Sequence, residues 1–96
     1  MGLNKSLRDA LEQLIDDTLA ESSNFVNVAR SFKHIISNDM DFALGLAIGE
    51  IIGGFYNYFM VANRRAMQQE ELLEMYYIIS ARAEEIRDAI LDAARR

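Results

Sequence analysis

The chain has 96 residues, of which 51% are hydrophobic and 26% are charged, and its formal net charge is -5. This length suits one domain, and the composition is close to the globular average, so we expect a single helical domain over residues 1–96. The ten basic residues are scattered along the chain. They form no basic stripe of the kind that phosphate recognition requires, so no nucleic-acid partner is expected.

The chain contains no proline, no cysteine and only five glycines. A β-rich chain of this length would need more turn residues, so the predicted fold class is an all-α bundle of four, or five, helices. The lack of cysteine excludes a disulfide framework and a thiolate metal site, and it fits a cytoplasmic protein. We expect a cytoplasmic location, with a membrane location as the alternative.

Two amphipathic helices are predicted in the first third of the chain. The first runs from about Asn4 to Ala20, and Ser6 is expected to begin it within a capping box. A turn is expected at residues 21–24, and the second helix covers Phe25–Ile36. His34 lies on the polar face of that helix without a neighbouring ligand cluster, which predicts a surface residue.

The third predicted helix, residues 40–62, is apolar nearly all round. Cap candidates precede it, and Glu50 is the one ionisable residue between Phe42 and Ala62. Glu50, Asn57 and Arg64 recur every seven residues and predict a narrow polar stripe. A helix of this kind is typical of a bundle centre, although its 21 largely apolar residues also suffice to cross a membrane. We expect the central element of a bundle, because the other helices have apolar faces that need a protein partner.

Three glycines, Gly45, Gly49 and Gly53, recur every four residues along this helix, and Gly54 follows directly. Each glycine costs about 0.8 to 1 kcal/mol in a helix interior, so tertiary packing must offset the cost. Such spacing lets another backbone approach closely, in a membrane dimer or in a soluble bundle. Alternatively, Gly53 and Gly54 end one helix and begin another.

Glu50 has three interpretations. A carboxylate in an apolar run must face water, find a partner or have a raised pKa. It belongs either to a solvated stripe shared with Asn57, or to a buried polar pair that fixes the register of an assembly. A proton-relay role is the third alternative.

The last predicted helix is long, from residue 68 to residue 94. A single helix that joins it to the third is the alternative. Apolar or small residues recur along it in alternating steps of four and three, which predicts a coiled-coil-like seam. The seam consists of Leu72, Tyr76, Ile79, Ala83, Ile86, Ile90 and Ala93.

Two acidic pairs on the same helix, Glu71 with Glu74 and Glu85 with Asp88, have the ExxE and ExxD spacing. This spacing resembles that of the all-helical nucleotide pyrophosphohydrolases similar to MazG, and the resemblance implies magnesium held by these carboxylates. In that family the pairs lie on helices that fold back together. Here a continuous helix would separate them by about 21 Å, beyond the reach of one magnesium site.

The sequence therefore predicts a non-catalytic assembly protein, with no cofactor and no metal, that forms a homodimer or a higher even oligomer and binds partners through its helices. The interface candidates are the three spaced glycines, Glu50, and the seam from Leu72 to Ile90. A small membrane-associated or single-span protein, through residues 42–62, is the second hypothesis. A metal-dependent hydrolase is the third.

Overall fold

The computed structural model describes residues 2–96, and within them every regular element is a helix. The predicted all-α bundle is thus confirmed. The elements are α1 (Lys5–Leu19), α2 (Ser22–Ser31), the short 3-10 helix η1 (Lys33–Ile35), α3 (Asp39–Asn63), α4 (Gln69–Ala81) and α5 (Ala83–Ala94).

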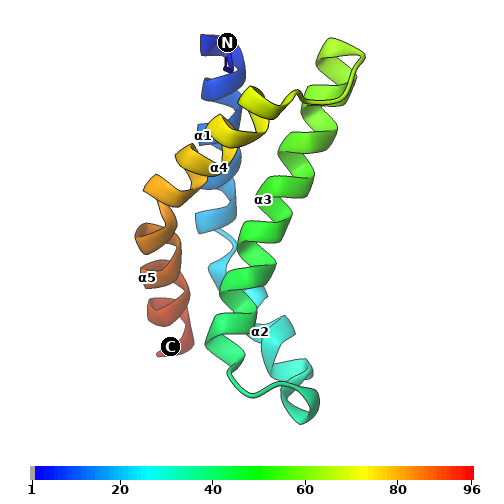
Figure 1. Ribbon diagram of the computed structural model, residues 1–96. Helices are drawn as coiled ribbons and strands as arrows, with labels where there is room; N and C mark the ends of the chain where they lie inside the picture. The colour runs from blue at the N-terminus through cyan, green and yellow to red at the C-terminus, as the bar shows by residue number, and fades with distance from the viewer. Residues whose placement is uncertain (1) are drawn as a thin grey trace.

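The helices form three antiparallel rods (Figure 1). The first rod is α1 followed by α2, the second is α3, and the third is α4 followed by α5, so two of the three rods bend where one helix gives way to the next. With 25 residues at 1.5 Å rise, α3 is about 37 Å long. It therefore extends along nearly the whole 41 Å long axis of the molecule.

The first helix has nearly its predicted bounds, but its cap differs from the predicted one and the first rod bends earlier than predicted. Asn4 caps α1, since its side-chain oxygen accepts the N–H of Leu7 at 2.9 Å, so the expected start at Ser6 is wrong. The bend lies at Ala20 and Glu21, and α2 already begins at Ser22. The Ser22 hydroxyl donates to the Leu19 carbonyl at 2.8 Å, which satisfies an orphan acceptor at the end of α1.

The second helix ends five residues before its predicted end. It stops at Ser31, and η1 continues the chain as a tighter turn that includes the exposed His34. The residue Asn38 then caps α3 by accepting the N–H of Asp41 at 2.9 Å. Asp39 and Asp41 place negative charge in the first turn of α3, where the helix dipole favours it.

The third helix is unbroken across Gly53 and Gly54, so the alternative of a break there is wrong. It ends at Arg64, whose backbone adopts the left-handed conformation at φ 55°. The Arg64 N–H donates to the Met60 carbonyl at 2.8 Å and closes the last turn. Residues 64–68 then form a loop, and α3 and α4 are separate helices.

The long terminal helix predicted for residues 68–94 is in fact two helices that meet at Arg82. The Arg82 guanidinium reaches across to α1, where it pairs with Glu12 at 2.9 Å and Asp16 at 2.7 Å. It also binds Glu85 on α5 at 3.0 Å. These carboxylates raise the pKa of Arg82, Glu85 first among them. The bend thus brings one cation to three anions, an arrangement that periodicity alone does not predict.

All five helices contribute to one apolar core. α3 supplies every fourth residue, Ala43, Ala47, Ile51, Phe55 and Phe59. Neighbouring residues such as Leu44, Ile48 and Ile52 are partly buried against the same core, whereas the row opposite, from Gly45 to Val61, is exposed. Only 22% of the most apolar window of α3 is buried. α3 contacts both other rods, as expected of a central element, but they do not enclose it.

Replacing Arg82 with Met, which keeps the aliphatic stem and removes the charge, should lower the free energy of unfolding by about 1–2 kcal/mol. The physical reason is that Glu12, Asp16 and Glu85 lose their shared cation. Urea denaturation measures the loss. Arg96→Met is the control, because its exposed pair with Asp92 should contribute less than about 0.5 kcal/mol. Equal losses of stability in the two variants would contradict a stabilising role for the ion pairs of Arg82.

Candidate functional site

The open face of α3 is the strongest candidate for a functional surface. Opposite its buried row runs a second row, also spaced by four residues, in which every member is exposed: Gly45, Gly49, Gly53, Asn57 and Val61. Two residues along a helix correspond to a rotation of about 200°, so this row lies on the far side from the core. We call it the open row.

Within residues 2–96, nothing fills the space beside the glycines of the open row. A Cβ atom built at Gly45, Gly49 or Gly53 would meet nothing within 4 Å. The packing that was expected to offset their helix cost is therefore missing from the single chain. At Gly54, by contrast, an added Cβ would lie 3.7 Å from Leu14 of α1.

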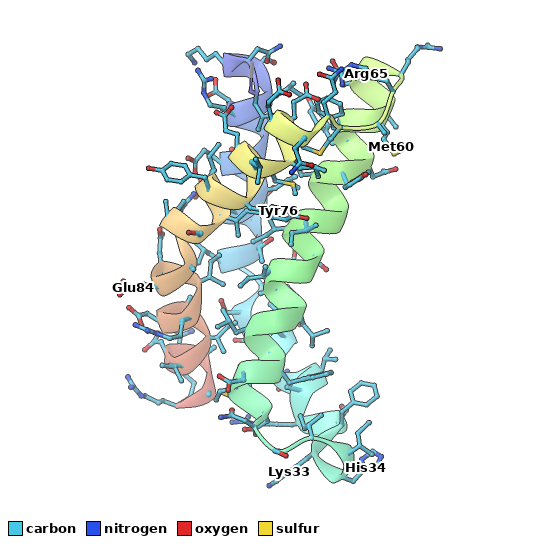
Figure 2. All side chains as sticks on the ribbon, in the orientation of Figure 1. Lys33, His34, Met60, Arg65, Tyr76 and Glu84 are labelled. Atoms are coloured by element: carbon cyan, nitrogen blue, oxygen red, sulfur yellow. The ribbon has the colours of Figure 1, made fainter. Side chains whose placement is uncertain are left out.

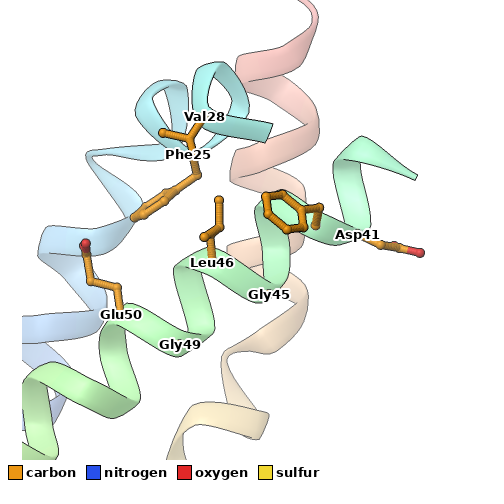
Figure 3. A pocket seen from close by; sticks show the side chains of 8 residues that line it. Phe25, Val28, Asp41, Gly45, Leu46, Gly49 and Glu50 are labelled. Carbon is orange, nitrogen blue, oxygen red and sulfur yellow. The ribbon is translucent and has the colours of Figure 1, made fainter. Parts of the chain in front are cut away.

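A groove of about 720 Å³ lies beside the first half of the open row, between α2 and α3. Figure 3 shows Phe25 and Val28 of α2 on one side and Leu46 between the two helices. Gly45 and Gly49 leave the groove open, because they place no side chain in it. The sequence analysis missed this groove, since Phe25 and Val28 have the spacing of ordinary core residues.

Two carboxylates flank the apolar groove. Asp41 lies at one end and Glu50 at the other (Figure 3). Both are exposed, and neither forms an ion pair within residues 2–96. In the single chain Glu50 thus belongs to a solvated stripe with the exposed Asn57 and Arg64.

Large exposed apolar side chains mark the second half of α3. Tyr58, Met60 and Val61 are 44%, 46% and 72% exposed, respectively. Figure 2 shows Met60 on the side of α3 that faces away from α4 and α5. The open face therefore has a hollow along its first half and the protruding side chains of Met60 and Val61 along its second half, whereas Tyr58, two residues from Met60, leaves α3 on the opposite side.

The predicted seam on the last rod does not join the open row. Ile79, Ile86 and Ile90 are buried in the core of the chain itself. Leu72 and Ala83 are partly buried, and Tyr76 is exposed. Most of the seam therefore packs against α1, α2 and α3 of the same chain. Of the predicted interface residues, the glycines of the open row, Glu50 and Tyr76 are exposed, whereas the other seam residues are buried or partly buried.

The carboxylates of the two hydrolase-like pairs each bind a protein donor. Glu74 accepts the Leu3 N–H at 2.6 Å, which ties the N-terminal segment to α4. Glu85 binds Arg82, and Asp88 binds Arg87. Among residues 2–96 no group of three or more histidine, aspartate or glutamate side chains could hold a metal ion. These carboxylates therefore stabilise the fold in this structure.

Glu71 is the most deeply buried carboxylate of the described chain, at 5% exposed. Arg65 binds it through two hydrogen bonds of 2.9 and 2.8 Å, and the Gln68 N–H donates to it at 2.7 Å. Arg65 also lies over the Phe59 ring at 5.0 Å. The hydrogen bonds from Arg65, supported by the Gln68 N–H, lower the pKa of Glu71 to about 2 against the opposing effect of burial. This cluster closes the loop between α3 and α4.

Comparison of the chain with models of protein families, with curated proteins and with solved structures finds no match.

If the glycine row has no partner within the chain, Gly45→Ala should raise the free energy of unfolding of the monomer by about 1 kcal/mol. The added methyl enters open space, and the helix gains propensity. Urea denaturation at a concentration where light scattering finds a monomer measures the gain. Ala10→Gly within α1 is the matched reverse change, and it should lower stability by a similar amount. A loss of stability in Gly45→Ala would reveal a contact of that glycine inside the chain.

The low pKa of Glu71 predicts that the free energy of unfolding decreases at acidic pH. A carboxyl whose pKa falls from 4.5 to about 2 on folding stabilises the fold at neutral pH. This contribution is lost as the pH falls from about 4.5 to about 2. The urea midpoint of the unmodified chain should therefore decrease over this range. Glu71→Gln should be less stable at pH 7 and should show a shallower decrease. The exposed Glu84→Gln should follow the unmodified chain.

Proposed function

We propose that the protein is a non-catalytic assembly protein, which self-associates through the open face of α3. The observation that carries the proposal is the open row itself. Three exposed glycines lie along an apolar helix, and no other part of the described chain packs into the space that they leave. Each costs about 0.8 to 1 kcal/mol relative to alanine. Close approach of another helix offsets such a cost, because it needs the space that a side chain would fill.

The apolar character of the uncovered surface supports the same conclusion. The groove beside Gly45 and Gly49 is lined mainly by apolar side chains, and Met60 and Val61 extend an apolar surface further along α3. Continuous exposed apolar patches on soluble chains mark association sites. A second copy presents the same face, so a symmetric dimer covers both faces at once.

A membrane span is the second candidate, because α3 is long and apolar enough to cross a bilayer and is mostly unburied. Against it stands the packing of the rest of the chain. α1 and α5 lie beside α3, and their outer faces carry exposed charges such as Glu12, Asp17 and Asp88. Each charge near a bilayer centre costs about 2.5 kcal/mol or more. We therefore favour a protein partner over lipid.

Light scattering of purified protein without detergent tests the proposal. The unmodified chain should be a dimer at micromolar concentration. Gly49→Glu should be a monomer with unchanged helical content, because its side chain enters open space in the single chain but blocks the close approach of a second helix. Ser80→Glu adds the same carboxylate to an exposed position of α4 and should remain a dimer.

A monomeric unmodified chain would contradict the proposal. If that chain is soluble only in detergent, the membrane candidate takes its place. Dimeric Gly49→Glu would show that association uses another surface.

A further inference from the structure

The two halves of the open face of α3 differ in shape. The groove lies beside residues 41–50, whereas the exposed side chains of Met60 and Val61 protrude from the second half. Two copies packed with α3 parallel would put groove against groove and protrusion against protrusion. Two copies packed with α3 antiparallel would put the protrusions of each copy into the groove of the other.

The charges divide along α3 in the same way. Asp39 and Asp41 stand at its first turn, whereas Arg64 caps its last turn. Neither Asp41 nor Arg64 forms an ion pair within residues 2–96. An antiparallel pair brings the acidic end of one helix to the basic end of the other, and it also opposes the helix dipoles. A parallel pair would bring like charges together at both ends.

We infer that the groove between α2 and α3 receives the second half of α3 from a second copy of the chain, with the two α3 helices antiparallel about a two-fold axis near Ile51. This inference rests on the proposed self-association and adds its orientation and its contacts. Each copy then fills one groove and has its own groove filled, as a closed symmetric dimer requires. Gly49 of each copy lies opposite the partner's Gly53, where neither residue has a side chain.

The lack of cysteine in the chain allows a direct test by cross-linking. In the antiparallel dimer Gly45 lies opposite the partner's Asn57, at a helix separation of about 8–10 Å. Each of these positions is about 18 Å along the helix from its own copy in the partner. In a parallel dimer each position would instead lie opposite its own copy in the partner, and Gly45 would be about 18 Å along the helix from the partner's Asn57.

Gly45→Cys and Asn57→Cys should therefore be made separately, and light scattering should confirm that each remains a dimer. A short bismaleimide should cross-link an equilibrated mixture of the two variants several-fold more than either variant alone. Preferential cross-linking of the separate variants would overturn the antiparallel arrangement, while self-association would stand. Dimers that cross-link in neither case would also overturn it, because α3 would then lie outside the interface. A monomeric unmodified chain would contradict the proposed function itself.

Discussion

The structure depends on one-sided burial of α3. Every fourth residue from Ala43 to Phe59 enters the core, and both other rods pack on that side. α3 is apolar nearly all round, but its fully buried residues lie on one face. The exposed apolar surface on its other face favours contact with a further partner.

The charged residues of the fold serve mainly to hold the ends and bends of these rods. Arg82 joins the bend between α4 and α5 to α1, and Arg65 with Glu71 closes the loop after α3. Both clusters use an arginine with several hydrogen bonds to carboxylates, the geometry that makes such pairs strong. The acidic pairs that resemble those of pyrophosphohydrolases are engaged in these and similar contacts.

Much of the fold could be predicted from the sequence, because helix periodicity and the lack of turn residues leave few alternatives. The apolar run of α3 was correctly placed. The break at Arg82 was not, since the heptad pattern continues through it and the bend depends on carboxylates 66 and 70 residues away in the chain, Asp16 and Glu12. The C-terminal seam was predicted as a surface for another subunit, but Ile79, Ile86 and Ile90 complete the chain's own core. Periodicity identifies an apolar face without identifying what covers it.

The same limit applies to the candidate site. The spacing of Gly45, Gly49 and Gly53 indicated a close approach, but only the packing of the other helices reveals that the row faces outward. The groove walls from α2 could not be identified, because Phe25 and Val28 have the same pattern as core residues. Glu50 was singled out because its neighbours in the sequence are apolar. The structure places it at the end of the groove.

Hydroxyl-radical footprinting over a range of protein concentrations measures the coverage of the open face most directly. Self-association through the open face predicts that oxidation of Met60 decreases as concentration rises and copies associate, while Tyr77, exposed on α4, keeps a constant rate as the internal reference. A constant rate of Met60 oxidation at every concentration would contradict the central claim, because the open face of α3 would then remain in water.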